Sequence, residues 1–390
     1  MMKVLHFSNK PAFPMRDGGC VAISSTLKSL LIDPTTDIHH LTISTIKHPF
    51  REDQYPASWV KRMKIYNVKI NTKTDLLGAA FYILKNKSYN IARFRDKKLK
   101  KKIIELLDQN QYDTVIFESI YTLPYLDLFL AKGCKVILRA HNVEHEIWSQ
   151  LGQQSSFFIK RWYFKKLSDQ LKNFELKELK KLDGIIAISE EDAKFFHQFS
   201  PKVNVTAIPT AVKTDFDLPN YELNDFYFLG AMDWRPNKEG IQWLLDKVVQ
   251  QGLKVVQLHI AGKALKKDEI THPSVVCHGE IENAKQFLDA HGICLIPMLS
   301  GSGIKIKLLE NMAMGKPIIS TTEGVRGVSV ENGKHVIIAD DPEEFRSAMY
   351  ELSLSKELRK KLGSNAKQFV IHNFGEDKVT RRLIAFIKES

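Results

Sequence analysis

The chain has 390 residues, which is too long for one compact core and fits two or three domains. With 44% apolar, 10% aromatic and 26% charged residues it has a globular composition, which excludes a disordered or collagen-like chain. Residues 1–208 hold 33 Lys and Arg against 21 Asp and Glu, whereas the remainder holds 24 of each, so the first half carries the whole formal charge of +12. This asymmetry predicts that the first half meets an acidic surface or an anionic partner, such as a membrane surface, a lipid phosphate or a nucleic acid.

Short apolar runs alternate with longer helical patterns along the whole chain. In the first half we expect strands at Val4–Ser8, His39–Ser44, Thr114–Glu118, Lys135–Ala140 and Gly184–Ser189, and helices at Val21–Leu31, Asp96–Asn110 and Ser156–Leu182. In the second half we expect strands at Phe226–Leu229, Val255–Ala261, Val275–His278, Ile293–Pro297, Pro317–Ser320 and His335–Ile338, and helices at Gly240–Gln250, Ala284–His291, Ile304–Met314, Pro342–Leu352 and Lys356–His372. Such alternation is typical of parallel sheets with crossover helices, so we predict the α/β class with two doubly wound domains.

The domain boundary is predicted from a stretch that lacks periodicity. Pro201–Pro219 contains three prolines and alternating charges, which suits an interdomain linker with a break near residue 210. We therefore expect an N-terminal domain of residues 1–209 and a C-terminal domain of residues 210–375. A last helical pattern, residues 376–390, is expected to pack back on the N-terminal domain.

Three features predict a cytoplasmic protein. No apolar run reaches the roughly 18 residues needed to span a bilayer, since even Tyr112–Ala131 contains Glu118 and Asp127. The N-terminus enters an expected strand without the pattern of a signal peptide. The cysteines have no C-x-x-C spacing and are interpreted as reduced structural thiols; they are Cys20, Cys134, Cys277 and Cys294.

The most informative pattern of the second half begins where a strand ends near Pro297. A loop of small residues, Gly301-Ser302-Gly303, follows, and a helix opens near Ile304. Free N–H groups at the start of a helix form an anion site, and Lys305 and Lys307 add positive charge there. The pattern predicts a site for a diphosphate.

A sugar contact is predicted on the same helix. Lys307 and Glu310 are three residues apart and share a helix face, where a carboxylate can accept hydrogen bonds from two ribose hydroxyls. The alternative is an ordinary strand, glycine turn and helix with a solvated pair of lysines.

With these residues the sequence resembles the GT-B glycosyltransferases, in particular the retaining family GT4. Leu309–Pro317 resembles the second half of the family's donor-nucleotide segment. Met232–Ile241 resembles the first loop of the family's C-terminal domain, and Gly279–Ala284 resembles the turn that holds the base. Arg139–His145 resembles the His-bearing turn of the family's first domain, and Asp17–Gly19 its glycine turn.

The resemblance implies two Rossmann-like domains that face each other across a cleft, the first binding the acceptor and the second the donor. It implies a retaining hexosyltransferase that moves a sugar from a UDP- or GDP-sugar to a glycan or lipid-linked acceptor in cell-surface polysaccharide synthesis. It implies no cofactor and no metal, and the sequence shows no Asp-x-Asp flanked by strand signals. The expected catalytic residues are His141, Lys305 and Lys307; the expected donor-binding residues are Glu310, Gly301, Ser302, Gly303, Ile304, Ile281, Arg235, Gly18 and Gly19; the expected acceptor residue is Glu118.

The candidates of the first half stand at expected strand ends, where open α/β sheets place their ligand groups. His141 follows the strand Lys135–Ala140, with His145 as a rival ligand and a structural cap as the alternative role. Gly18 and Gly19 would let the backbone approach a phosphate. For Glu118 a buried or solvated carboxylate is the alternative to an acceptor contact.

Two departures from the family pattern concern the donor. Many members carry two glutamates eight apart, and the earlier of the pair falls at Ser302. The positions of a phosphate-binding Arg and Lys are also changed and hold Ala231 or Met232, and Glu239. We therefore expect Lys305 and Lys307, with Arg235, to neutralise the phosphates.

Two segments of the first half favour an anionic surface as partner. Lys85–Lys102 holds nine Lys and Arg and one acid, Asp96, which suits either a solvated helix face or a membrane or polyanion contact. Phe157–Lys166 mixes aromatics and cations, which suits a buried aromatic face with lysines reaching solvent or an interfacial segment on anionic lipid. We hypothesise peripheral contact with the inner face of a membrane and an acceptor held there.

Other functions stay open at this point. A nucleotide-sugar epimerase of the same fold would act without an acceptor glycan. A basic, non-catalytic nucleic-acid-binding protein is disfavoured, because the chain lacks zinc-finger spacing, an RNP-like aromatic strand and a basic heptad region. We therefore expect no nucleic-acid partner.

Overall fold

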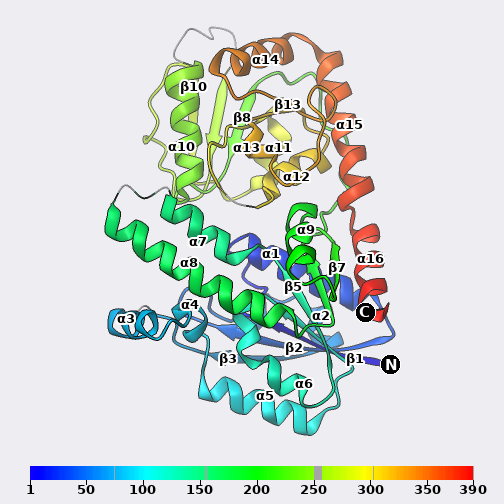
Figure 1. The fold of residues 1–390 in the computed structure, drawn as a ribbon. Helices are drawn as coiled ribbons and strands as arrows, with labels where there is room; N and C mark the ends of the chain where they lie inside the picture. The colour runs from blue at the N-terminus through cyan, green and yellow to red at the C-terminus, as the bar shows by residue number, and fades with distance from the viewer. Residues whose placement is uncertain (74, 154, 156, 250–256, 302, 390) are drawn as a thin grey trace. The chain divides into compact units, whose positions relative to one another are not determined.

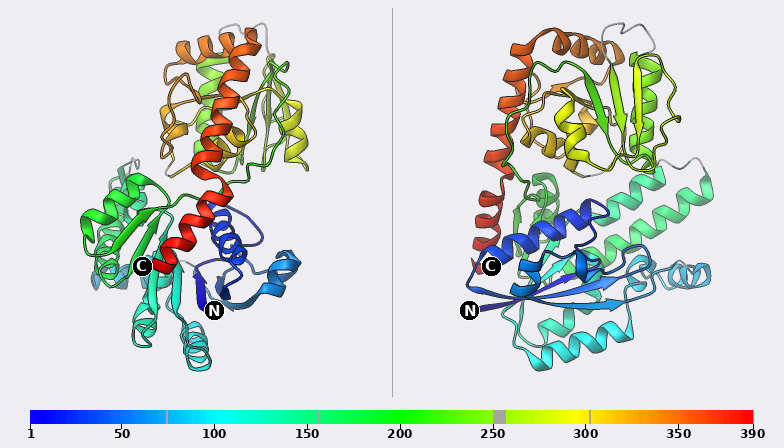
Figure 2. Two further views of the ribbon diagram at one scale, coloured as in Figure 1. Left: turned by 90° about the vertical axis from the view of Figure 1, so that its right-hand side faces the viewer. Right: turned by 180° about the vertical axis from the view of Figure 1, so that it is seen from behind.

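The computed structural model describes residues 1–73, 75–153, 155, 157–249, 257–301 and 303–389. The chain divides into two compact units: unit 1 is Met1–Ala211 with Val379–Ser390, and unit 2 is Val212–Lys378. Each unit is built on one parallel β-sheet with helices on both faces (Figures 1 and 2). The predicted α/β class with two doubly wound domains is confirmed.

Unit 1 contains a seven-stranded sheet in the order β3-β2-β1-β4-β5-β6-β7. Its strands are β1 (Met2–Ser8), β2 (Thr36–Ser44), β3 (Met63–Lys69), β4 (Thr114–Glu118), β5 (Lys135–Ala140), β6 (Gly184–Ala187) and β7 (Asn204–Ala207). Its helices are α1 (Gly18–Ile32), α2 (Ala57–Arg62), α3 (Leu76–Leu84), α4 (Tyr89–Ala92), α5 (Lys97–Gln109), α6 (Leu126–Leu130), α7 (Glu144–Gln153), α8 (Phe158–Leu179), α9 (Glu190–Phe199) and α16 (Glu376–Glu389), with 3₁₀ turns η1 (Glu52–Gln54) and η2 (Ile120–Tyr125).

Unit 2 contains a six-stranded sheet in the order β10-β9-β8-β11-β12-β13. Its strands are β8 (Phe226–Leu229), β9 (Leu258–Ala261), β10 (Val275–Gly279), β11 (Ile293–Ile296), β12 (Ile318–Ser320) and β13 (Ile337–Ile338). Its helices are α10 (Arg235–Trp243), the π-helical η3 (Leu244–Val249), α11 (Ala284–Ala290), α12 (Ile306–Ala313), α13 (Thr322–Val325), α14 (Pro342–Leu354) and α15 (Lys356–Phe374).

Alternation along the strands gives each sheet two cores. Leu5 and Phe117 point to the core formed with α5, α6, α8 and α9, while their neighbours Val4 and Ile116 point to the opposite core. Because both faces are buried, the strands read as nearly continuous apolar runs. In unit 2, Phe226 likewise faces the core of α10 and α14.

The C-terminal helix α16 belongs to unit 1, where the sequence predicted that it would pack. Leu383 and Ile387 are buried with Leu27 of α1 in one apolar cluster. The hydroxyl of Thr380 donates to Ser29 Oγ at 2.9 Å. Burial of apolar side chains therefore anchors α16.

The structure corrects several element boundaries. The edge strands β3 and β7 and the helix α7 were not predicted, because β3 and β7 are short or half-exposed and lack a full apolar run. Helix α10 begins at Arg235 and not at Gly240, because Pro236 in its first turn favours a helix start. Parts of three predicted elements, Ser156, Gln250 and Val255–Val256, lie outside the described residues.

Gly240 lies inside α10 for a packing reason. A Cβ at this position would stand 2.1 Å from the carbonyl oxygen of Pro297. The glycine lets α10 approach the chain that leaves β11, which brings the loops after β8 and β11 together.

Candidate functional site

Both sheets share the strand order 3-2-1-4-5-6 of doubly wound folds, counted within each unit. The order reverses between β1 and β4 in unit 1 and between β8 and β11 in unit 2. Ligands of open α/β sheets bind outside the carboxyl ends of the strands at such a switch point. Most of the candidate residues lie at these two edges.

The loop between β11 and α12 is the predicted diphosphate loop of unit 2. Gly301 has φ 119° and Gly303 has φ 72°, values that favour glycine at both positions. Trp234, from the loop after β8, lies against Gly301, since a Cβ there would stand 3.4 Å from its ring. Ser302 lies outside the described residues, so the structure says nothing of the missing glutamate.

Lys305 is turned into this loop. Its ammonium donates to the carbonyl oxygens of Gly301 and Gly303, both at 2.9 Å, and lies 3.4 Å from the carboxylate of Glu323. The side chain is 3% exposed. These contacts give Lys305 the role of closing the loop, in place of the phosphate contact that the sequence suggested.

Lys307 occupies the space between β8 and α10. Its Nζ donates to Asn237 Oδ1 at 2.8 Å and lies 4.3 Å from the centroid of the Phe228 ring. Burial lowers the pKa of Lys307 to about 8, and the Lys305 charge acts in the same direction. An ammonium has three N–H donors, so an anion that reached this group would regain the electrostatic stabilisation lost on burial.

Two residues that the sequence did not single out lie around the Lys307 ammonium. Asn237 also donates to Ala231 O at 2.8 Å, which orients its amide oxygen toward Lys307. A Cβ at Gly230 would stand 3.0 Å from Lys307 Nζ, so glycine leaves room for the ammonium beside the backbone. A glycine directly after a central strand and an Asn in the first turn of the next helix are the signals that could have identified them.

Glu310 lies one turn along α12 from Lys307. The residue is exposed, and no described residue bonds to its carboxylate. Burial of the Glu310 carboxyl group by the surrounding protein nevertheless raises its pKa. Helix α12 starts after Lys305 without a described side-chain cap, which leaves its first N–H groups for a ligand.

The other donor candidates are placed less directly. Arg235 is exposed and pairs with Glu239 at 2.6 Å, and the hydroxyl of Ser300 donates to the other oxygen of Glu239 at 2.9 Å. The Arg235 charge is thus already compensated. Ile304 and Ile281, which follows β10, are half-buried against the apolar core of α11 and α12.

At the switch point of unit 1, imidazoles and a carboxylate form a continuous chain. Glu118 Oε2 lies 2.5 Å from His141 Nε2, and Oε1 lies 3.0 Å from His6 Nε2. His6 Nδ1 in turn lies 3.0 Å from His40 Nδ1. The four residues come from β1, β2, β4 and the end of β5.

The ionisation of Glu118 sets the direction of these hydrogen bonds. Burial raises the pKa of Glu118, but His141 and His6 outweigh it and hold that pKa well below its usual range. An ionised carboxylate only accepts, so His141 and His6 must both donate through Nε2. Neutral His141 then keeps a lone pair on Nδ1.

The expected acceptor contact of Glu118 needs correction. The residue is fully buried, and both carboxylate oxygens already accept hydrogen bonds from histidines. Glu118 therefore positions His141 and offers no surface to an acceptor. Its place at the end of an expected strand is the signal that pointed to it.

The glycine turn of unit 1 leads into α1, which begins at Gly18. The carboxylate of Asp17 caps this helix by accepting from Cys20 N at 3.0 Å, and it also contacts Lys10 at 2.7 Å and His48 at 3.0 Å. A Cβ at Gly19 would collide with the end of the Lys10 side chain. The helix start thus already holds one protein carboxylate.

The rival ligand His145 is turned inward. Its Nδ1 lies 2.5 Å from Glu175 Oε2 and the residue is buried. The neighbouring Glu144 was missed by the sequence reasoning: burial, followed by the charge of Glu175, raises its pKa to about 7. Tyr121 donates its hydroxyl to Glu144 at 3.1 Å.

Comparisons with known proteins agree with this architecture. Residues 224–354 match the family model of the glycosyl transferases group 1. An uncharacterized 44.6 kDa protein in the cps region of Klebsiella pneumoniae is 26% identical, with 97% of this chain and 98% of that protein covered.

Solved structures with the GT-B fold are also similar over the full chain. Anabaena HepE in complex with UDP gives a TM-score of 0.69 at 11% identity and covers 100% of both chains. Sucrose-phosphate synthase from Thermosynechococcus elongatus gives a TM-score of 0.70 at 12% identity, with 100% of this chain and 99% of that chain covered.

Proposed function

We propose that this chain, a glycosyltransferase of the GT-B fold, moves a sugar from a nucleoside diphosphate to a glycan or lipid-linked acceptor with retention of configuration. The observation that carries the donor half of this proposal is the half-buried Lys307 beside the uncapped start of α12. The expected base is uracil or guanine.

Departure of the diphosphate concentrates negative charge on the leaving group. A fixed cation and free backbone N–H groups, positioned before the reaction, stabilise that charge more than they stabilise the intact donor. We assign this role to Lys307 and the first turn of α12. Since these groups supply the charge, the proposed reaction takes place without a divalent ion at the diphosphate.

Glu310 is assigned to the ribose. Its carboxylate has no described partner and lies one turn from Lys307, which matches the separation between the phosphates and the sugar of a nucleotide. Two hydroxyl protons donated to one carboxylate would fix the nucleoside. Lys305 supports both contacts by holding the loop closed.

His141 is assigned to the reacting sugar. Because His141 donates a hydrogen bond to Glu118 through Nε2, its free Nδ1 can accept a hydrogen bond from a hydroxyl of the donor sugar.

We propose that the acceptor is held at a membrane and that the reaction belongs to polysaccharide synthesis. The position of the Klebsiella relative in a cps region supports the pathway. Phe157, Phe158, Ile159 and Trp162 at the start of α8 are exposed, so the alternative of a buried aromatic face does not hold for them. Among the described residues, no helix combines the length and apolar character needed to cross a bilayer.

The other basic segment gives weaker support. In α5 the apolar side of the helix, including Leu99 and Ile103, is buried, while all the lysines of residues 97–101 are exposed. This agrees with the solvated helix face that the sequence allowed. The proposed membrane contact therefore rests on the start of α8.

The test is product analysis with the full chain. UDP- and GDP-sugars are supplied with lipid-linked acceptors in the presence of EDTA, and anomeric configuration is read by NMR. We expect an acceptor-dependent product whose linkage keeps the donor configuration. Conversion of the donor to an epimer without acceptor would instead assign an epimerase, and an inverted linkage would overturn retention.

A further inference from the structure

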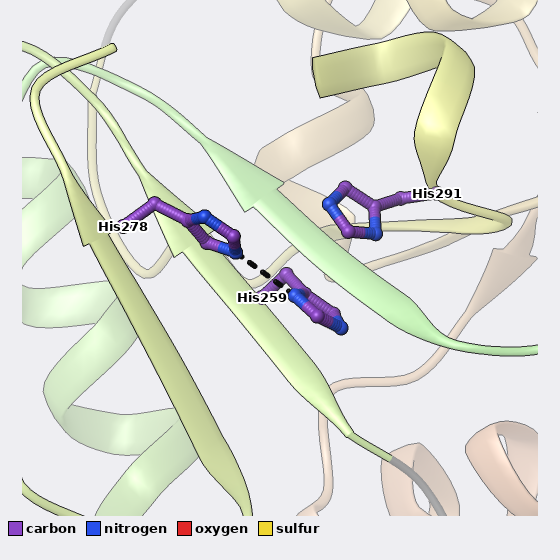
Figure 3. A group of neighbouring side chains, drawn as sticks. All are labelled: His259, His278 and His291. Carbon is purple, nitrogen blue, oxygen red and sulfur yellow. Dashed lines mark hydrogen bonds between the residues drawn. The ribbon is translucent and has the colours of Figure 1, made fainter.

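Three histidines of unit 2 converge on one point away from the donor loop. His259 stands in β9, His278 in β10, and His291 just before β11 (Figure 3). One ring nitrogen of each lies within 4.8 Å of the others. None of them has a role in the proposed transfer.

The contacts among these rings leave specific nitrogens facing one another. His259 Nδ1 lies 2.9 Å from His278 Nε2. Two nitrogens bound to one tetrahedral zinc at about 2.0–2.1 Å are separated by roughly 3.3 Å. The observed spacing is therefore close to that of two ligands of one ion.

A carboxylate lies behind two of the histidines. Asp225 Oδ2 is 2.5 Å from His291 Nδ1 and 3.7 Å from His259 Nε2. Its Oδ1 accepts from the backbone N–H of Gly292 at 3.0 Å, which fixes the carboxylate. Histidines that bind metals usually donate their other ring N–H to such a carboxylate, which sets the tautomer.

The position of Asp225 thus decides which nitrogen of His291 is free. Donation to Asp225 through Nδ1 leaves His291 with a lone pair on Nε2. At 3.7 Å the contact of His259 Nε2 with Asp225 is too long for a hydrogen bond, and the ring nitrogen of His259 that is bonded is Nδ1, to His278 Nε2. His259 Nδ1 and His278 Nε2 share one proton in their hydrogen bond, and release of that proton would let both nitrogens join His291 Nε2 as ligands.

We propose that His259, His278 and His291 bind one Zn²⁺, with Asp225 holding His291 in the ligating tautomer. Three imidazoles suit a divalent zinc ion and leave a fourth position for water. Binding replaces the His259–His278 hydrogen bond and separates the rings of His259 and His291, which stack with centroids 4.0 Å apart.

The site has a structural role in this proposal. Asp225 and His291 precede β8 and β11, and His259 is the second residue of β9, so these three lie toward the amino ends of their strands, whereas His278 lies near the carboxyl end of β10 and the donor loop follows the carboxyl end of β11. Zinc here would join β9 and β10 to the connection between α11 and β11. The proposal is independent of the proposed transfer reaction, which needs no ion at the diphosphate.

The test uses the untagged full chain, stripped with EDTA and dialysed against metal-free buffer. Zn²⁺ is titrated by calorimetry, bound metal is counted by mass spectrometry, and Co²⁺ serves as a spectroscopic probe. We expect one equivalent of zinc, a higher melting temperature with zinc, and visible Co²⁺ bands of a four-coordinate site.

Variants assign the ligands. His278→Ala should abolish the tight site, and Asp225→Asn should weaken zinc binding by about 10- to 100-fold. His372→Ala, at an exposed position on α15, is the matched control and should bind like the parent. Circular dichroism of each metal-free variant separates loss of ligands from loss of fold.

Two results would overturn the proposal. One is a correctly folded parent that binds no zinc. The other is zinc binding that survives in His278→Ala and is lost in His48→Ala, because Asp17, Cys20 and His48 form a second cluster with nitrogen, sulfur and oxygen atoms within 4.8 Å. In that cluster Asp17 is already bonded to Lys10, which makes it the weaker candidate.

Discussion

Lys307 Nζ donates to Asn237 Oδ1 over 2.8 Å, and this bond joins the first turn of α12 to the first turn of α10. The two helices follow β11 and β8, the strands on either side of the switch point of unit 2. A cation is thereby fixed at the place where an open α/β sheet binds its ligand.

Removing this cation should slow the chemical step. We expect Lys307→Met to lower kcat by about 10- to 150-fold, from the roughly 1.5–3 kcal/mol of a hydrogen bond to a charged group, while the donor KM changes less. Steady-state kinetics measure both constants. Lys238→Met, at an exposed position of α10, is the control. Equal losses in binding and turnover would show that Lys307 only binds the donor.

The lowered pKa of Lys307 predicts a pH dependence of donor binding. With a pKa of about 8 the free protein loses this charge as the pH rises through 8, earlier than an ordinary lysine. A diphosphate raises the pKa again, so binding near pH 8 should take up a proton and should weaken at higher pH. Calorimetry of UDP or GDP in buffers of different ionisation enthalpy measures the uptake, which should disappear in Lys307→Met.

The assignment of Glu310 to the ribose predicts a specific loss of discrimination. Glu310→Ala should weaken binding of the nucleoside diphosphate by about 5- to 150-fold, since two hydrogen bonds at about 0.5–1.5 kcal/mol each are lost. A 2′,3′-dideoxy analogue should bind the parent as weakly as the variant, and the variant should no longer distinguish the two ligands. Additive losses from variant and analogue would contradict the assignment.

The chain of histidines in unit 1 predicts that Glu118 acts through His141. Glu118→Gln places an amide between two imidazoles, so at least one of them must change tautomer. We expect kcat to fall by at least about 100-fold with an altered pH profile and little change in donor KM.

A second buried pair provides the matched control for Glu118. His145 and Glu175 are also 2.5 Å apart and buried. Glu175→Gln should lower the melting temperature without altering the pH profile of kcat. If Glu118→Gln behaves in the same way, Glu118 has a structural role only.

The sequence predicted the fold class because short, largely apolar runs alternate with longer helical patterns along the chain. The edge strand β3 was not predicted, because its alternation of buried and exposed residues resembles that of a surface segment. Helix α7 was not predicted because it begins at Glu144, shortly after His141, and contains few apolar residues.

The site was predicted unevenly. Spacing along one helix was enough to relate Lys307 to Glu310, because both belong to one periodic element. Which of two neighbouring lysines turns into the glycine loop depends on the backbone path at Gly301 and Gly303, which spacing does not contain. The two partners of Glu118, His6 and His141, come from β1 and the end of β5, so only the sheet order brings them together.

The exposed residues at the start of α8 predict binding to anionic membranes. Phe158 and Ile159 are 81% and 78% exposed, and Lys160 and Arg161 follow them directly. Apolar side chains that enter the interface beside cations bind anionic lipid through both burial and charge. Sedimentation of the full chain with phosphatidylserine vesicles should therefore fall when salt is raised.

Two variants separate the two contributions. Phe158→Ser with Ile159→Ser should remove most of the binding at every salt concentration, while Lys160→Glu with Arg161→Glu should remove its salt dependence. Both should leave the melting temperature unchanged, because the side chains bury little surface within the protein. Leu354→Ser, at an exposed apolar position of α14, is the control and should sediment like the parent. Unchanged vesicle binding in the serine variant would exclude this segment as the membrane contact.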